Sequence, residues 1–172
     1  MNLRHLWIAR HAEATEDESG LSAAGERQAA LLGERLAGVP FAAVEHSPLP
    51  RAVRTAELAA RHLPGVPVRV AAELDDRVPT AANSAAMLAR YTGPAPEETY
   101  QLVVTHAFQV AWFVRAALGT PEERWRDLIP ANTGLTVIRY FPDGRTRVLV
   151  FNDLAHLPAE LRWTGSPPEL RL

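Results

Sequence analysis

Short apolar runs alternate with longer amphipathic stretches over most of the chain. The apolar runs contain several β-branched residues and predict short, buried strands. Such strands are expected at residues 3–9, 41–46, 66–70 and 100–105. Two further runs, 133–141 and 146–151, flank Pro142, Asp143 and Gly144, a pattern that is typical of a β-hairpin.

Between these runs, apolar residues recur at helical spacing and the segment ends carry capping signals. Ser22 is expected to cap a helix that reaches about residue 37, and Ser47 with Pro48 is expected to begin another. Further helices are expected at 81–90, at 108–118 and from 120 onward, and the Pro-rich tail at 158–172 is expected to be irregular. The alternation predicts an α/β fold, a three-layer sandwich with a mostly parallel central sheet flanked by helices. Residues 1–172 are expected to form a single domain.

Arginine, histidine and acidic side chains follow the ends of the predicted strands. In open α/β sheets, ligands bind beyond the carboxyl ends of the strands. The first strand leads to Arg10 and His11, the second to Arg51 in the following helix, and the fourth to His106. An acidic loop at 73–76 follows the third strand. Because arginine forks and helix N-termini match phosphate oxygens, the sequence predicts a site for a phosphate monoester.

Composition narrows the chemistry further. The chain has no cysteine, and all 18 of its basic residues are arginine. These absences exclude cysteine-nucleophile phosphatases, thiol proteases, Schiff-base catalysis and a Walker A phosphate loop. A net charge of -2 leads us to expect neither nucleic acid nor membrane as a partner. The first residues lack signal-peptide order and no apolar run reaches membrane-span length, so we expect a cytoplasmic location.

Several segments together resemble the histidine phosphatase (phosphoglycerate mutase-like) superfamily. Residues 10–13 (RHAE) resemble its RHG-type signature, and 21–29 (LSAAGERQA) resemble its L-T-x-x-G-x-x-Q-A helix. Residues 47–56 (SPLPRAVRTA) are similar to its S-P-L-x-R-A-x-x-T-A segment. Residues 103–106 (VVTH) and 152–157 (NDLAHL) resemble its later histidine strand and closing motif. The likeness covers nearly the whole chain and implies a phosphoglycerate mutase-like fold.

The resemblance also implies roles for the matching residues. His11 is expected to be the nucleophile and to become phosphohistidine. Arg10 and Arg51 are expected to bind phosphoryl oxygens, and His106 is the second pocket histidine that contacts the phosphoryl group. Cationic side chains can stabilise the charge on a transferring phosphoryl group, so we expect no metal and no other cofactor.

The general acid is less sharply defined by the sequence. The family places a carboxylate, often in an L-x-E pattern, between the arginine segment and the second histidine. Leu74 aligns with that leucine, which puts Asp76 where glutamate is usual, and Asp75 and Glu73 remain alternatives. The chain also departs from the family in having Ala12 where glycine is usual.

Other polar and aromatic residues near these motifs have no assigned role. Glu13 follows the nucleophile and is expected either to shape the pocket or to be a solvated loop charge. Phe108, Trp112 and Asn132 are left open as residues on the substrate side, with core packing the simpler interpretation of the two aromatic residues. His156, although it matches the closing motif, is expected to be a structural hydrogen-bonding residue.

The resemblance implies a phosphomonoester hydrolase of the histidine acid phosphatase type, acting on a small phosphorylated substrate through phosphohistidine on His11. The alternatives are a phosphohistidine-protein phosphatase, a cofactor-dependent phosphoglycerate mutase and a phosphate-binding pseudoenzyme. The short segment 79–96 favours hydrolysis, because a pocket without a large cover admits water. A homodimer is compatible with the sequence, which decides neither the oligomeric state nor the particular phosphoester.

Overall fold

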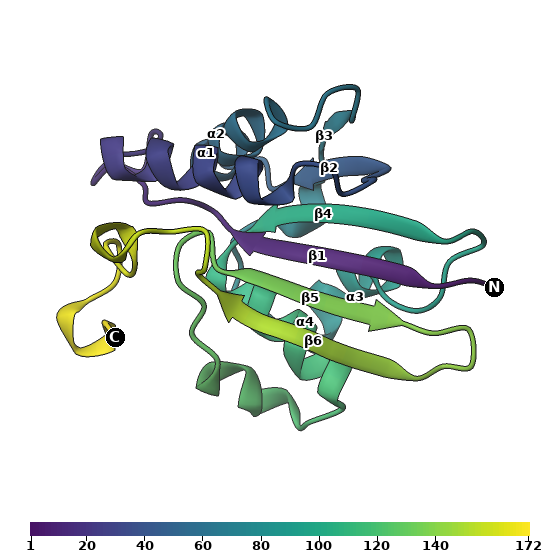
Figure 1. Ribbon diagram of the computed structural model, residues 1–172. Coiled ribbons are helices and arrows are strands. Elements are labelled where there is room, and N and C mark those ends of the chain that lie inside the picture. The colour runs from purple at the N-terminus through teal and green to yellow at the C-terminus, as the bar shows by residue number, and fades with distance from the viewer.

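Six strands form one mixed sheet in the order β3-β2-β4-β1-β5-β6 in the computed structural model, which describes residues 1–172 (Figure 1). The strands are β1 (Arg4–Arg10), β2 (Ala43–His46), β3 (Val68–Val70), β4 (Thr99–Thr105), β5 (Leu135–Tyr140) and β6 (Thr146–Asp153). Strands β3, β2, β4 and β1 run parallel, and β5 and β6 complete the sheet as an antiparallel hairpin. The predicted α/β fold with a mostly parallel sheet is therefore confirmed.

Two pairs of helices cover the two faces of this sheet. The helices are α1 (Ala23–Leu36), α2 (Pro50–Ala60), α3 (Ala81–Tyr91) and α4 (Ala107–Leu118). Helices α1 and α2 pack together on one face, and α3 and α4 lie behind the sheet in the view of Figure 1. This arrangement is the three-layer sandwich expected from the alternating pattern.

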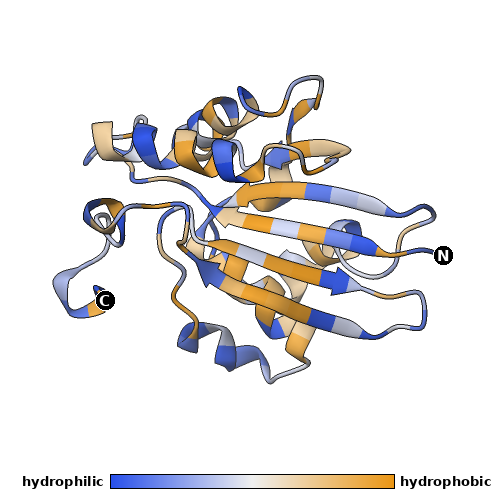
Figure 2. Cartoon of the chain, in the orientation of Figure 1, coloured by the Kyte–Doolittle hydropathy of each residue, from blue (hydrophilic) through white to orange (hydrophobic).

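Each face of the sheet has its own apolar core. Beneath α3 and α4, side chains such as Trp112 and Phe113 pack on Ile8 and Val103. Beneath α1 and α2, a second cluster is built from the helix and strand residues Leu32, Leu36, Ala52, Ala56, Val44, Leu102 and Val104. Figure 2 shows the matching stripes of hydrophobic residues along the central strands. Burying each large apolar side chain contributes about 1.5–3 kcal/mol, so both layers stabilise the sheet between them.

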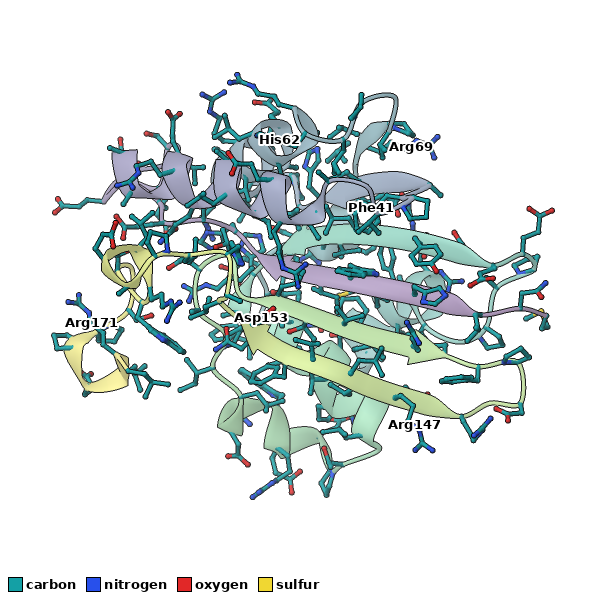
Figure 3. The ribbon with its side chains drawn as sticks, in the orientation of Figure 1. Phe41, His62, Arg69, Arg147, Asp153 and Arg171 are labelled. Carbon is teal, nitrogen blue, oxygen red and sulfur yellow. The ribbon has the colours of Figure 1, made fainter.

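The second core extends toward the edge of the sheet through aromatic contacts. Phe41, labelled in Figure 3, lies just before β2, and its ring meets that of Trp7 edge-on at 5.8 Å between centroids. Edge-to-face packing of this kind is the favoured geometry for aromatic pairs. It fixes β1 and the start of β2 within the layer that also holds α1.

Helix boundaries follow the sequence signals in part. Ser22 caps α1 as predicted, because its side chain accepts a hydrogen bond from the Gly25 amide at 3.0 Å. The second helix begins at Pro50 and not at Pro48, and Leu49 occupies the N-cap position without a side-chain bond. Pro50 still occupies the first turn, where its missing N–H costs nothing.

Two other segments differ in detail from the pattern-based prediction. The helix expected from residue 120 is a short 3₁₀ helix, Glu122–Asp127, which is too brief for a stable run of α-helical bonds. The tail contains two short 3₁₀ turns, Ala159–Leu161 and Pro168–Leu170, and otherwise lacks regular structure. None of the helices combines the length and the apolar character needed to cross a membrane.

Candidate active site

The parallel register of β1 and β4 brings the two predicted histidines together. Arg10 pairs with Thr105, so the residues that follow them, His11 and His106, leave the sheet side by side. The His11 amide donates to the Thr105 carbonyl at 2.8 Å, and the two imidazole rings lie 5.2 Å apart between centroids. Adjacent parallel strands thus converge two residues that are 95 positions apart in the sequence.

His11 is held by one ring nitrogen and faces a cation with the other. Its Nδ1 donates to the carbonyl of Ala12 at 2.7 Å, and its Nε2 accepts from Arg51 Nε at 3.2 Å. The side chain is buried, and burial together with the charge of Arg10 lowers the pKa of His11 well below its usual range. The imidazole is therefore neutral, with its lone pair on Nε2.

The loop after His11 is fixed by the neighbouring helices. The Ala12 amide donates to Thr55 Oγ1 in α2 at 2.9 Å, and the Glu13 amide donates to Gln28 Oε1 in α1 at 2.9 Å. Ala12 itself is fully buried, so a methyl group is accommodated where the family usually has glycine. These bonds hold the carbonyl that orients the His11 ring.

Arg51 lies in the first turn of α2 and all three of its guanidinium nitrogens have partners. Besides the bond to His11, Nη2 donates to Asp76 Oδ2 at 2.8 Å, and Nη1 meets Glu18 Oε2 at 3.4 Å. Arg51 is 6% exposed, whereas the side chain of Glu18 is two-thirds exposed. The guanidinium fork, whose geometry also matches phosphoryl oxygens, therefore binds carboxylates here.

His106 is oriented from the opposite side of its ring. Its Nε2 is hydrogen-bonded to Ser47 Oγ at 2.7 Å, and its Nδ1 lies 3.7 Å from Asp76 Oδ2 with no hydrogen-bond partner. Burial outweighs the attraction of Asp76 and lowers the pKa of His106 to about 4. Ser47 was expected to cap the second helix, and that prediction is wrong. Leu49 is the N-cap residue, and the Ser47 hydroxyl accepts from the Leu49 amide at 3.3 Å while it is also hydrogen-bonded to the histidine ring.

Arg10 reaches the same cavity from the end of β1. Its Nη1 donates to the Pro130 carbonyl at 3.0 Å, and its buried Nε has no partner. Burial lowers the pKa of Arg10 from its usual value, although Asp76 acts in the opposite direction. Because an arginine retains its proton even then, the side chain presents a second guanidinium to the cavity.

The acidic loop is anchored so that one of its three carboxylates reaches the cavity. Thr105 Oγ1 donates to the Leu74 carbonyl, and Gln109 Nε2 donates to the Arg77 carbonyl, both at 2.8 Å. Asp76 lies between these anchors and lines the cavity. The other two candidates turn away, because Asp75 accepts from the Asp76 amide at 2.8 Å and Glu73 accepts from Arg90 at 2.7 Å.

The cavity has a volume of about 290 Å³ and is strongly polar. It is lined by Arg10, His11, Glu13, Ala14, Thr15, Glu16, Glu18, Arg51, Asp76, Asn132 and Gly165. His106 is not among these residues, since it lies beneath the cavity and is 1% exposed. No group of three or more histidine or acidic side chains is arranged to hold a metal ion.

Some lining residues were missed or left open by the sequence analysis. Asn132 donates through Nδ2 to the His11 carbonyl at 2.9 Å and so braces the loop that carries His11. Gly165 belongs to the C-terminal segment, which lies beyond the carboxyl ends of β1 and β4 in Figure 1. The sequence predicted only an irregular tail for this segment. The one local signal that its backbone approaches another part of the chain is the isolated glycine between Thr164 and Ser166.

The remaining histidine and aromatic residues near the motifs do not line the cavity. Trp112 is buried in the core, and Phe108 packs against the ring of Trp125 at 4.9 Å between centroids. His156 is hydrogen-bonded through Nε2 to Thr133 Oγ1 at 3.1 Å, and burial lowers the pKa of His156 to about 4. The simpler interpretation, core packing, is confirmed for Trp112 but is wrong for Phe108, which packs on Trp125 at the surface and is 39% exposed.

Solved structures with this fold include several phosphate-handling proteins. "Mycobacterial hydrolase 2" aligns with a TM-score of 0.74 at 21% sequence identity, covering 94% of this chain and 95% of its own. Phosphoglycerate mutase from Plasmodium falciparum aligns with a TM-score of 0.69 at 22% identity, covering 92% and 96%. At such identities the likeness establishes the phosphoglycerate mutase-like fold.

Curated proteins that match the chain include a serine/threonine-protein phosphatase named PGAM5, mitochondrial. The human protein is 28% identical over 187 residues, and the rat protein is 27% identical over 188 residues. The alignments cover 91% of this chain but only 65% of each relative. The chain therefore matches the larger part, and not the whole, of these relatives.

These names contradict the cytoplasmic location expected from the sequence, because the matching relatives are mitochondrial proteins. The expectation rested on the lack of a recognisable signal. Receptors read location from short targeting segments, so the pattern of a folded catalytic region carries little information about it. We withdraw that prediction.

The family is identified by a match over most of the chain. The model of the histidine phosphatase superfamily (branch 1) matches residues 6–79 and 80–154. The matched ranges include the strand ends that bring Arg10, His11, Arg51, Asp76 and His106 together. The chain belongs to the histidine phosphatase superfamily.

Proposed function

We propose that this protein is a phosphomonoester hydrolase whose nucleophile is Nε2 of His11. One observation carries the proposal. The bond from Nδ1 to the Ala12 carbonyl, at 2.7 Å, fixes the tautomer whose lone pair lies on Nε2, beside the guanidinium of Arg51. A neutral imidazole with a fixed tautomer is an effective nucleophile toward phosphorus. Phosphatases among the relatives and the phosphohistidine chemistry general to the family support the same assignment.

In the first step, Nε2 of His11 attacks phosphorus. The P–N bond forms, the P–O bond to the alcohol breaks, and the leaving oxygen takes a proton from Asp76, whose carboxylate receives that proton from the substrate monoanion when substrate displaces it from Arg51. Arg10 and Arg51 bind the equatorial phosphoryl oxygens, so substrate displaces the carboxylates now at the Arg51 fork. If the Ser47 hydroxyl donates to Nε2 of His106, the Nδ1–H of that ring becomes a further donor to the phosphoryl group.

In the second step, a water molecule attacks the phosphorus of phosphohistidine. Asp76, now a carboxylate, accepts a proton from the water as the new P–O bond forms. The P–N bond breaks, its electron pair returns to Nε2, and inorganic phosphate leaves. The histidine is restored in its neutral form, and no electron donor or acceptor is required.

Hydrolysis, and not transfer, is supported by the position of the segment at residues 79–96. Helix α3 occupies most of that segment, and its Met87 and Tyr91 are buried in the core with Leu74 and Phe113. A helix packed into the core cannot also close over the cavity. Water therefore has access to phosphohistidine, which disfavours retention of the phosphoryl group for a mutase reaction.

A protein phosphatase is the second candidate function. It is favoured by the curated relatives, which are named serine/threonine-protein phosphatases and match over 91% of this chain. The phosphohistidine-protein phosphatase, one of the alternatives left open by the sequence, falls within the same class. Release of phosphate from phosphoprotein substrates, but not from small esters, would support it.

The test compares wild type with His11→Ala in EDTA, using small phosphomonoesters, a phosphoserine protein, a phosphohistidine protein and 3-phosphoglycerate. We expect phosphate release by wild type and its loss in the variant. His62→Ala is the matched control, because His62 lies in the turn after α2, away from the cavity (Figure 3). Activity retained by His11→Ala would overturn the nucleophile assignment. Efficient isomerisation with little release would indicate a mutase, and phosphate binding without turnover a pseudoenzyme.

A further inference from the structure

A second hollow, distinct from the polar cavity, lies at the surface around the first turn of α4. Its volume is about 300 Å³, and five of its six lining residues are apolar. The lining residues are Ala107, Phe108, Trp125, Arg126, Leu128 and Ile129. The side chains of Phe108 and Ile129 are exposed. Large apolar side chains that gather around an exposed hollow indicate a binding surface, whereas single exposed ones do not.

Two walls of the hollow adjoin residues of the candidate active site. Ala107 follows His106 directly at the start of α4. On the other side, Ile129 precedes Pro130, whose carbonyl accepts a hydrogen bond from Arg10 Nη1 at 3.0 Å. The hollow therefore begins one residue away from the second histidine on one wall, and one residue away from the carbonyl that holds Arg10 on the other.

The acidic loop approaches the same turn of α4. Gln109, which follows Phe108, donates through Nε2 to the Arg77 carbonyl at 2.8 Å. Under the proposed function, Asp76 in this loop protonates the leaving oxygen, so the leaving alcohol is released beside the loop and next to the first turn of α4. The polar cavity offers that alcohol little apolar contact, because Ala14 is the only hydrophobic residue of its lining.

The floor of the hollow is fixed by the core. Trp125 is buried in the apolar core beneath α3 and α4, and Leu128 packs against that core. The rings of Phe108 and Trp125 are inclined by 63°, and the Arg126 guanidinium lies 4.8 Å from the centroid of the Trp125 ring. A wall that is already ordered loses little further entropy when a ligand binds. Small-molecule pockets have volumes of about 300–1,000 Å³, so the hollow suits a substituent of a small ligand.

We propose that the apolar hollow is the leaving-group subsite and binds an aromatic group of the substrate. The proposal rests on the phosphomonoesterase function proposed above and adds the substrate class to it. Preferred substrates are small phosphomonoesters in which an aromatic ring is joined to the ester oxygen through a few bonds. Such a ring packs against Phe108 and Ile129 and removes apolar surface from water. A strongly hydrated alcohol, such as the glycerate of 3-phosphoglycerate, gains nothing from the apolar wall.

Binding without turnover is the direct test. The ligands are 3-phenylpropylphosphonate and propylphosphonate, which differ by the phenyl ring alone and cannot be hydrolysed. We expect calorimetry to give a Kd about tenfold lower for the phenyl ligand, because one face of its ring leaves water. Equal affinities of wild type for the two ligands would overturn the proposal.

Two variants and one control locate the ring. Phe108→Ala removes one wall of the hollow, and Ile129→Ser makes another wall smaller and polar. Both are expected to reduce the affinity ratio of the two phosphonates to about threefold or less, with the Kd for inorganic phosphate unchanged. Leu118→Ala removes an exposed apolar side chain at the far end of α4 and is expected to retain the full ratio. If the ratio survives in both hollow variants, as judged on folded protein, or falls equally in the control, the ring binds elsewhere.

Turnover assays separate this proposal from the proposed function. The substrates are 3-phenylpropyl phosphate and propyl phosphate, and we expect kcat/KM to be about tenfold higher for the phenyl ester. Discrimination between the phosphonates without hydrolysis of either ester would sustain the subsite and reject the phosphatase. Equal kcat/KM values for the two esters, together with equal phosphonate affinities, would do the reverse.

A phosphorylated protein segment is the alternative occupant of the hollow. Phosphoserine peptides with phenylalanine or glycine beside the phosphoserine test it. A subsite for small esters predicts that Phe108→Ala lowers kcat/KM for 3-phenylpropyl phosphate, while wild type treats the two peptides alike. Discrimination between the peptides that is lost in Phe108→Ala, with equal affinities for the two phosphonates, would assign the hollow to a protein substrate and reject the small ester.

Discussion

His11 and His106 lie side by side at the ends of neighbouring strands, but the fold holds them by opposite ring nitrogens. His11 is tied through Nδ1 to a backbone carbonyl, which leaves Nε2 free to act. His106 is tied through Nε2 to the side chain of Ser47, which leaves Nδ1 beside Asp76. His11 lines the cavity and His106 lies below it. The atom that restrains each ring, and not its position on the sheet alone, therefore decides which nitrogen is left without a restraint, and under the proposed function this gives the two histidines different tasks.

The largest expected effect breaks this pair directly. His11→Ala is expected to lower kcat/KM by roughly 10⁴-fold or more and to abolish phosphoenzyme, because the atom that bonds to phosphorus is gone. His106→Ala is expected to cost about 10²-fold and to keep a slow-forming phosphoenzyme, because it removes a donor only. Rapid quench with labelled substrate measures both. If His11→Ala keeps the phosphoenzyme and His106→Ala loses it, His106 and not His11 is the nucleophile.

The next effect concerns Asp76, the carboxylate that pairs with Arg51 and lies 3.7 Å from Nδ1 of His106. Asp76→Asn is expected to lower kcat for an alkyl phosphate by about 10²–10³-fold, since the alkoxide then leaves without a proton. For p-nitrophenyl phosphate, whose leaving group needs no proton, we expect a loss of about tenfold or less. Steady-state kinetics on the two substrates measures the difference. Asp75→Asn is the matched control, and an equal loss in that variant would contradict the choice of Asp76.

A smaller loss of activity is expected when the hydrogen bond from Ser47, which restrains the His106 ring, is removed. Ser47→Ala frees Nε2 and lets the ring take either tautomer, so we expect about a tenfold decrease in kcat/KM. Nitrogen NMR of the imidazole is expected to show a mixture of tautomers in place of one. Ser84→Ala removes another buried hydroxyl, in α3, and is expected to change neither quantity. A single unchanged tautomer in Ser47→Ala would show that Ser47 does not orient the ring.

A smaller effect is expected at the exposed partner of Arg51. Glu18→Gln removes a carboxylate that competes with phosphate for Nη1, so the Kd for inorganic phosphate should decrease by roughly two- to fivefold. Glu16→Gln removes a charge from the same cavity without that contact and serves as the control for a general charge effect. Calorimetry measures both. Equal changes in the two variants would mean that the contact itself contributes nothing.

The last prediction is that neither histidine becomes protonated over a pH range in which an ordinary histidine does. Burial lowers the pKa of both histidines, so each remains neutral as the pH falls from 7 to 5. A histidine with an ordinary pKa of about 6.5 would be mostly protonated at pH 5. The ring proton resonances of His11 and His106 should therefore hold their neutral positions over this range. Movement of either resonance with a midpoint near pH 6.5 would show that the fold does not keep that ring neutral.

The sequence indicated which residues meet but not how they are restrained. Alternating apolar runs and the strand ends were enough to bring His11, His106 and Arg51 to one edge of the sheet. The capping preference of serine, a local rule, suggested a helix start at Ser47, whereas α2 starts at Pro50 and the Ser47 hydroxyl bonds both the Leu49 amide and, across the fold, His106. No local pattern reveals the position of Gly165, because its closeness to Asn132 depends on a segment without regular structure.

The buried amide of Gln28 links the cavity to that segment. Its Oε1 accepts from the Glu13 amide, and its Nε2 donates to the Leu161 carbonyl and to Thr164 Oγ1. A single side chain in α1 thus joins the loop after the nucleophile to the C-terminal turn. Because energetic coupling is reciprocal, a ligand that steadies the loop is expected to slow protease cleavage of the turn as well. Trp163 is buried within that turn, so a change in its fluorescence on ligand binding, measured against a Trp163→Phe variant, would report such coupling.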